Sequence, residues 1–180
     1  MMTDLRQAKR NRFFAGKILT AEDLTLEQDY FREKSTRHNR YLHGFGVVSG
    51  LDISSRGGEI VISSGLAVDC SGNEIVVAEP TCISLAQLKG VGGSIFLNLM
   101  YREVEMDPVP SIDSSSGTES STILETFEAL WEKNNRNAGH RHVKGRWLPC
   151  GQSHGLTIAR LRLSSGRWRV DRRYRRPVIK

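Results

Sequence analysis

The chain has 180 residues, a formal net charge of +6, 38% apolar residues and 26% charged residues. A chain of this length is expected to form one domain that buries about 70% of the surface its unfolded form exposes. No run of about 18 apolar residues predicts a membrane-spanning helix, and no apolar N-terminal segment predicts a secretory signal, so we expect a cytoplasmic product.

The first predicted element is a helix that follows a polar and basic lead-in at residues 1–19. Thr20 is the expected N-cap, because its side chain can accept a backbone N–H bond from the first turn while Asp23 bonds back to it. No proline or glycine interrupts residues 21–43, which predicts a long helix of about twenty residues. Gly44 is its expected end, since glycine enters the left-handed backbone region without a steric penalty.

The predicted helix is amphipathic. Leu24, Phe31, His38 and Leu42 recur at intervals that place them on one face, so we expect this stripe to pack near the start of a sheet. The lead-in carries two apolar pairs of its own. We expect these pairs to pack on the helix or on a neighbouring subunit. They are Phe13-Phe14 and Ile18-Leu19.

Short strand-forming runs separated by glycine turns follow the helix, a pattern typical of a small antiparallel sheet or barrel. We predict a hairpin between residues 47–53 and 59–62, a second hairpin between residues 65–69 and 74–77, and a short edge strand at residues 82–85.

The second half of the chain begins with a strong strand at residues 94–106, which the prolines of residues 107–110 are expected to stop. Residues 111–122 are predicted to be a polar, mobile loop. Residues 123–133 are ambiguous between helix and strand, and their propensities favour a short helix capped by Thr122. A hairpin between residues 156–163 and 167–171 is predicted to precede a basic tail.

These elements predict an α+β fold: a long N-terminal helix packed on a mostly antiparallel β-sheet or small open barrel. We expect one compact domain with four parts. They are the lead-in at residues 1–19, the helix and β-rich core at 20–133, a basic loop at 134–155, and the C-terminal hairpin and basic tail at 156–180.

The positive charge is concentrated at one end of the sequence. Residues 136–180 contain eleven arginines and two lysines against a single acid, Asp171. Such a segment indicates an acidic partner, either nucleic acid or an acidic protein surface. Trp, Tyr and Arg are enriched at protein interfaces, and arginine pairs bidentately with carboxylates, so a protein interface is the favoured interpretation.

Two groups of residues are the candidates for that interface. The apolar candidates, which belong either to the interface or to the core, are Phe13, Phe14, Tyr30, Tyr41 and Phe45. The electrostatic candidates are Arg167, Arg169, Arg172, Arg173, Arg175 and Arg176. The alternative is a nucleic-acid-binding accessory protein, because Arg167-Trp168-Arg169 and Arg172 to Arg176 interleave arginines with aromatic residues that can stack on bases.

Metal and catalytic sites are less favoured. His140, His142, Cys150 and His154 are weak zinc candidates, whose spacing matches no familiar finger. The chain has no G-x-S-x-G nucleophile motif and no P-loop, so we predict neither an enzyme nor a cofactor. The three cysteines are interpreted as reduced thiols, with a Cys70–Cys82 bridge as the alternative.

Four blocks of sequence carry a family resemblance. The blocks are Phe14-x-Gly16-Lys17-x-Leu19-Thr20-x-x-Asp23 with its continuation through His43-Gly44-x-Gly46-Val47-Val48-x-Gly50-Leu51, then residues 65–77, residues 101–110, and residues 156–177. They cover nearly the whole chain. Together they resemble small structural proteins encoded with phage-tail-like contractile injection systems of bacteria.

The resemblance implies a structural subunit of a contractile particle, without indicating whether it sits at the baseplate, on a fibre or at the cap end. The implied partners are copies of itself, as a trimer or hexamer, and sheath, tube, baseplate or cap subunits. Nucleic acid and direct membrane insertion are not expected. The subunit would be made in the bacterial cytoplasm without a signal peptide, for a particle that is released or membrane-anchored.

Overall fold

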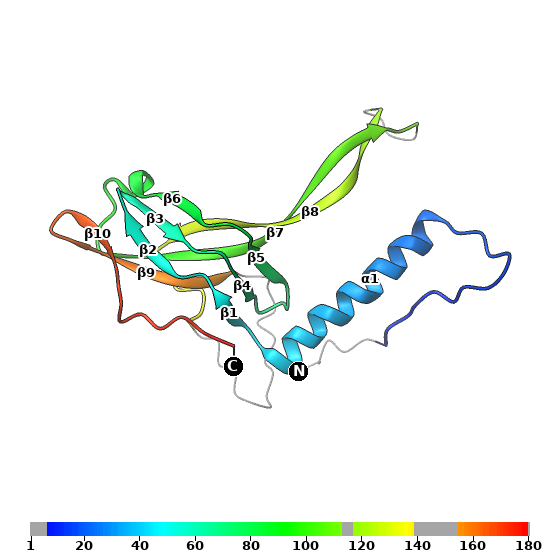
Figure 1. The fold of residues 1–180 in the computed structure, drawn as a ribbon, viewed down its shortest axis with the longest axis horizontal. Coiled ribbons are helices and arrows are strands. Elements are labelled where there is room, and N and C mark those ends of the chain that lie inside the picture. The colour runs from blue at the N-terminus through cyan, green and yellow to red at the C-terminus, as the bar shows by residue number, and fades with distance from the viewer. Residues whose placement is uncertain (1–6, 113–116, 139–154, 180) are drawn as a thin grey trace.

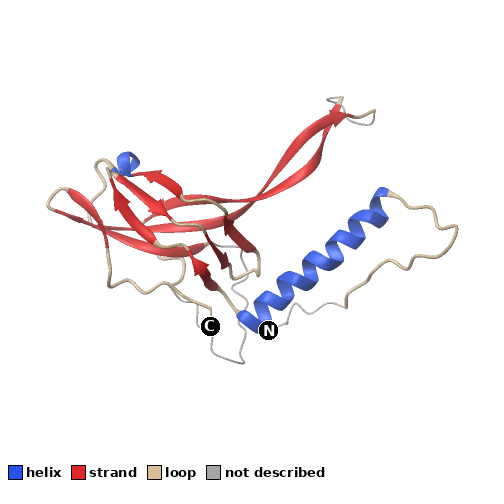
Figure 2. Cartoon of the chain, in the orientation of Figure 1, coloured by secondary structure: helices blue, strands red, loops and turns tan. Residues whose placement is uncertain are grey.

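The computed structural model describes residues 7–112, 117–138 and 155–179, which form a β-rich body with one α-helix beside it (Figures 1 and 2). The helix α1 spans Ala21–His38 and continues as a π-helical turn at Asn39–His43. The first six strands are β1 (Gly46–Gly50), β2 (Ile53–Arg56), β3 (Glu59–Ile62), β4 (Gly65–Val68), β5 (Glu74–Val77) and β6 (Thr81–Ser84). A 3₁₀ turn at Leu85–Leu88 leads to β7 (Ser94–Pro110), β8 (Thr118–Glu132), β9 (Leu156–Ser164) and β10 (Arg167–Val170).

The start of α1 is the predicted one. Thr20 caps the helix, and the reciprocal bonds with Asp23 complete a capping box. The α-helix is shorter than predicted, because it gives way at Asn39 to a π-helical turn in which the Gly44 N–H bonds to the Asn39 carbonyl (2.9 Å). Gly44 ends the turn with a φ of +80°, as expected of a terminating glycine.

The prediction that α1 packs on the sheet through its apolar stripe is wrong. No residue of α1, all of which the structure describes, is buried, and Leu24, Phe31 and Leu42 are exposed. The helix contacts the strands through polar side chains: Arg32 pairs with Glu103 of β7 (2.7 Å), and just after α1 the Asn39 side chain donates to the Gly72 carbonyl (3.1 Å). Figure 1 shows the N-terminal end of α1 pointing away from the β-rich body. The physical reason is that the strands supply a complete core of their own.

That core lies between three antiparallel sheets, which curve around it as a half-barrel. Their strand orders are β1-β4-β5, β2-β3-β6 and β10-β9-β7-β8. The largest fully buried apolar side chains are Leu51, Ile60, Ile62, Ile75, Leu97, Leu99, Leu156 and Leu161. The α+β prediction is therefore right in its coarser form: the protein is mostly antiparallel β-structure with one helix.

The predicted hairpin between residues 47–53 and 59–62 is only half right. The predicted first strand splits into two, because Gly50 and Leu51 both adopt left-handed φ values (+58° and +56°). β1 then pairs with β4, whereas β2 pairs with β3. The predicted hairpin of β4 with β5, the edge position of β6 and the hairpin of β9 with β10 are all confirmed.

The largest correction concerns residues 107–133. β7 does not stop before residue 107 but runs to Pro110, and residues 123–132, predicted to favour a helix, belong to β8. The two strands pair from Phe96–Glu132 to Pro110–Thr118, so cross-strand hydrogen bonds override local helix propensity. Beyond Leu99, β7 pairs with β8 alone among the described strands, which leaves one side open where proline is tolerated.

Candidate docking surfaces

The far ends of β7 and β8 form a two-stranded projection that we call the arm, defined as residues 103–110 and 118–125. Figure 1 shows the arm extending from the body on the same side as α1. Because side chains alternate along a strand, the two faces of the arm differ. One face carries Glu103 and Glu105 opposite Glu125 and Ile123, and the other carries Val104 opposite Leu124. All of these residues are exposed.

A groove lies between α1 and the carboxylate face of the arm. Its volume is about 890 Å³, and Phe31 of α1 and Ile123 of β8 supply its large apolar side chains. Four glutamates line it, Glu103, Glu105, Glu119 and Glu125. Arg32 also lines it, and an ion pair with Glu103 (2.7 Å) occupies this guanidinium. The groove is therefore lined by carboxylates together with two large apolar side chains.

A second hollow of about 480 Å³ lies next to the groove, closer to the body. Tyr101 lines it and donates a hydrogen bond to Glu103 (2.8 Å), the same carboxylate that Arg32 holds. Burial raises the pKa of the Tyr101 phenol, and the hydrogen bond to Glu103 and the charge of Glu125 act in the same direction. Tyr101 therefore stays neutral and keeps its proton for Glu103.

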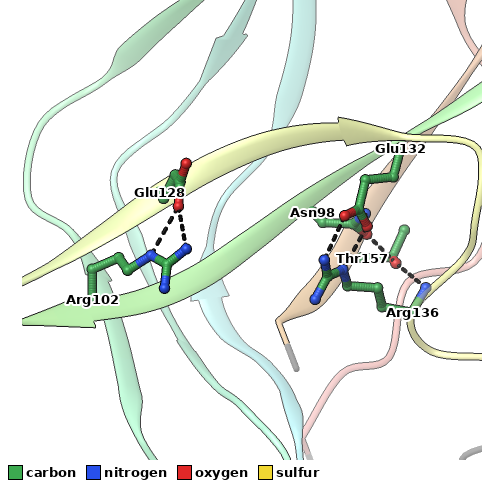
Figure 3. A network of polar contacts seen from close by, with 6 residues as sticks. All are labelled: Asn98, Arg102, Glu128, Glu132, Arg136 and Thr157. Carbon is green, nitrogen blue, oxygen red and sulfur yellow. Dashed lines mark hydrogen bonds and ion pairs between the residues drawn. The ribbon is translucent and has the colours of Figure 1, made fainter. Parts of the chain in front are cut away.

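The strands that carry the arm are joined inside the body by a polar network between β7, β8 and β9 (Figure 3). Asn98 and Thr157 are fully buried, and Asn98 donates to Glu132 (2.6 Å) while the Thr157 hydroxyl accepts from the Arg136 backbone N–H (2.9 Å). The Thr157 hydroxyl also donates to the side-chain amide oxygen of Asn98. The Arg136 guanidinium holds the pKa of Glu132 below its ordinary value. Further along the strands, the Arg102 guanidinium donates two hydrogen bonds to the Glu128 carboxylate (2.8 and 2.6 Å).

A second candidate surface follows β10 and the segment after it. It is an arginine edge whose members are all exposed: Arg167, Arg169, Arg172, Arg173 and Arg175. Asp171 is the only acid among residues 155–179 and faces inward, where the backbone N–H of Arg173 (3.0 Å) and the guanidinium groups of Arg160 and Arg162 bind it. These partners, with the Arg173 N–H foremost, lower the pKa of Asp171. The arginine edge thus presents positive charge outward.

Arg176, predicted with the other arginines as an interface residue, lies elsewhere. Its guanidinium donates to the carbonyl oxygens of Gly50 (3.0 Å) and Leu51 and pairs with Asp52 (3.0 Å). These bonds tie the C-terminal segment to the loop between β1 and β2. Arg176 therefore holds the fold together and is not part of the arginine edge.

The predicted aromatic candidates are in three different settings. Phe13 and Phe14 are exposed on the lead-in, whereas Tyr30 and Tyr41 are half-buried on α1 and the π-helical turn. Tyr30 makes an edge contact with Phe31, with ring centroids 5.2 Å apart. Phe45 packs against the hydrophobic core. Of these five candidates, only the two lead-in phenylalanines are exposed.

The zinc candidates His140, His142, Cys150 and His154 lie outside the described residues. Within the described ranges, no three His, Cys, Asp or Glu side chains gather in a way that would hold a metal ion. Cys70 and Cys82 are not bridged; Cys70 is buried and Cys82 is exposed. No helix in the described part of the chain is long and apolar enough to cross a membrane.

Sequence reasoning missed the acidic groove. Its arm side depends on pairing residues 103–105 with residues 123–125, and the sequence predicted a strand end and a helix there. The alternation of Glu103, Val104, Glu105 and Met106 was the available signal, because a period of two is typical of a strand with two unlike faces.

Three solved structures share the fold. A chain of the type VI secretion system TssK–TssF–TssG baseplate subcomplex matches 96% of this chain with a TM-score of 0.55 at 13% identity. A chain of the type VI secretion baseplate complex matches 96% with a TM-score of 0.54 at 12% identity, and the crystal structure of TssK matches 92% with a TM-score of 0.52 at 13% identity. No protein-family model and no curated protein sequence gives a match.

This chain spans 62%, 60% and 41% of the length of the three matched chains. At 12–13% identity the likeness concerns the fold. In fold, the described chain is similar to baseplate proteins of the type VI secretion system.

Proposed function

We propose that this protein is a structural assembly subunit of a contractile injection system, of baseplate type, which works by docking on neighbouring subunits. The observation that carries the proposal is the fold shared with type VI secretion baseplate chains over 96% of this chain. The resemblance of its sequence blocks to small proteins of phage-tail-like contractile systems supports the same class independently.

The surfaces of the molecule support a docking role. A helix without buried residues, a projecting arm and an exposed arginine edge contribute little to the core of the isolated chain. Large exposed apolar residues gather on the lead-in, α1 and the arm, and gatherings of this kind mark interaction sites. In this proposal the arginine edge binds a carboxylate-rich face of another baseplate subunit through bidentate pairs.

The arrangement of the aromatic residues favours a protein partner over nucleic acid. Base stacking requires exposed aromatic rings between the arginines. Trp168 packs against the core, and Tyr174 is half-buried, with its ring 6.0 Å from that of Phe96 and its hydroxyl accepting from Asn137 (3.1 Å). Neither ring is therefore exposed for base stacking next to the arginine edge.

Charge reversal tests the proposal. The variant Arg172→Glu/Arg173→Glu/Arg175→Glu leaves Arg176 in place and should fold, yet it should be missing from purified contractile particles. The control Arg56→Glu/Lys89→Glu/Lys133→Glu makes the same charge change at exposed positions that are not members of the edge and should be incorporated normally. Full incorporation of the first variant would contradict docking through the arginine edge.

The same variants also test the alternative function, nucleic-acid binding. A nucleic-acid-binding protein would shift generic DNA in a gel, with binding that falls steeply as salt rises, and the edge variant would lose that shift. We expect no salt-sensitive shift with the wild-type protein. Particles that lack this chain altogether, combined with salt-sensitive DNA binding, would favour the accessory-protein role.

A further inference from the structure

The lead-in is held in shape while its apolar side chains point outward. The Asn11 side chain donates to the Asp23 carbonyl, Lys17 pairs with the Asp23 carboxylate (2.9 Å), and the Lys17 N–H bonds to the Phe14 carbonyl (3.1 Å). The Lys17 ammonium holds the pKa of Asp23 below its ordinary value. Despite these bonds, 65% of Phe14 and 84% of Ile18 remain exposed.

From the sequence, these apolar residues were expected to pack either on the following helix or on a neighbouring subunit. The structure excludes the helix as a cover in this chain, since Phe13, Phe14, Ile18 and Leu19 are all more than half exposed. A segment that is already shaped and exposes apolar side chains loses little freedom when it docks. Of the two expected packing partners, a neighbouring subunit is the one that remains.

The groove between α1 and the arm complements the lead-in in both charge and polarity. Residues 7–19 contain Lys9, Arg10, Arg12 and Lys17 and no acid. The groove offers the glutamates Glu105, Glu119 and Glu125 around Phe31 and Ile123. The basic and apolar side chains of the lead-in therefore complement the acidic and apolar side chains of the groove.

The lead-in does not fill the groove of its own chain. Among the described residues, the groove is lined by α1 from Gln28 onward and by the arm, and no lead-in residue takes part. The bonds of Asn11 and Lys17 to Asp23 hold the lead-in at the N-terminal end of the helix. Binding of the lead-in to the groove of another copy would cover both surfaces, and a contact between two different surfaces of identical subunits is one route to oligomers.

We propose that the lead-in of one copy, residues 7–19, docks in the α1–arm groove of a second copy. Phe13 and Phe14 lie against Phe31 and Ile123, and the lead-in cations that precede Phe13 pair with the groove glutamates. This inference rests on the proposed assembly role and names the contact by which copies bind one another. The contact is head-to-tail, so its repetition closes a ring or builds a stack.

Disulfide trapping tests the contact on the full chain. In a Cys82→Ser/Cys150→Ser background, mixing a Phe14→Cys protein with an Ile123→Cys protein under mild oxidation should give a disulfide-linked dimer. Val76→Cys is the matched control, because Val76 on β5 is 55% exposed and Ile123 is 58% exposed. We expect several-fold more dimer with Ile123→Cys than with Val76→Cys.

Charge exchange provides a second measurement. Arg12→Glu alone and Glu119→Lys alone should each weaken self-association measured by light scattering, and the chain carrying both changes should recover it. Glu79→Lys, also exposed but away from the groove, should have no effect.

Three outcomes would overturn the inference. They are a wild-type protein that stays monomeric at all concentrations, equal trapping at residues 123 and 76, and a Phe14→Cys/Ile123→Cys chain that links only within itself. Because these measurements use the isolated protein, failure here would leave incorporation into particles, tested through the arginine edge, as a separate question.

Discussion

The backbone of Gly72 lies against the carbonyl oxygen of Thr36, so closely that a Cβ on Gly72 would stand well inside 3.0 Å of that oxygen. This contact joins the turn between β4 and β5 to the last turn of α1. Together with the bonds of Asn39 to the Gly72 carbonyl (3.1 Å) and to Glu74 (3.2 Å), it sets where the helix leaves the body. The orientation of α1, and hence the groove beside the arm, depends on it.

Gly72→Ala should therefore loosen α1. Gly72 has a φ of +91°, so alanine adds backbone strain as well as the clash with Thr36. Gly58→Ala is the matched control, because Gly58 has a φ of +86° and open space around it. We expect Gly72→Ala to cost about 1–3 kcal/mol more than the control in free energy of unfolding, the usual range for overpacking. Equal losses in chemical denaturation would show that the helix is not positioned by this contact.

Thr20→Ala should fray the start of α1. A lost N-cap costs about 1 kcal/mol, and α1 has no buried residue to compensate for the loss. Hydrogen exchange should speed up in the first turn of α1 and stay unchanged in the β-sheets. Thr25→Ala is the control, since Thr25 bonds only to the Ala21 carbonyl (2.9 Å) within the helix. Unchanged exchange in Thr20→Ala would mean that the cap does not stabilise the helix.

Thr157→Val should lower the stability of the polar network that joins β7, β8 and β9. The change keeps the shape of the side chain but removes a hydroxyl that donates to Asn98 and accepts from the Arg136 N–H. Leaving these buried groups unpaired costs about 1–3 kcal/mol. Thr81→Val, on the edge strand β6, removes a bond to the Glu79 carbonyl (3.2 Å) that is exposed and should cost much less. Similar midpoints for the two variants in urea would contradict this role for the network.

Asp171→Asn should change the dependence of stability on pH. The pKa of Asp171 is lowered in the folded protein, so its contribution is present above the ordinary aspartate value of 3.8 and is lost as pH falls through the folded value. The variant should be less stable than wild type near neutral pH, and the difference should shrink below about pH 4. Asp52→Asn is the comparison, since the Asp52 side chain is 84% exposed and its pair with Arg176 is screened by solvent. A difference that does not change with pH would contradict the charged role of Asp171.

The features that could be predicted from sequence are the ones set by neighbours along the chain. The Thr20 capping box, the glycine end at Gly44 and the start of the strand at residue 94 all depend on residues within a few positions of one another. Caps, turns and side-chain alternation are local in this sense. The same holds for the hairpins of β4 with β5 and of β9 with β10.

The features that could not be predicted depend on partners far away in sequence. Residues 123–132 have helix propensity, and only their pairing with β7 makes them a strand, because the ladder satisfies backbone groups along its whole length. The arginine composition did not show that Arg176 is bound to the loop after β1, over 120 positions away, while Arg172, Arg173 and Arg175 face outward.

The sequence by itself determined that this protein is a mostly antiparallel β-domain with one capped helix and a basic C-terminal edge, because these properties follow from local backbone preference and composition. Only the tertiary structure decided that the helix stands away from the core and that an arm lies beside it with an acidic groove between them. Burial is a property of the whole packed chain: the strands close the core, and the apolar stripe of α1 is left exposed.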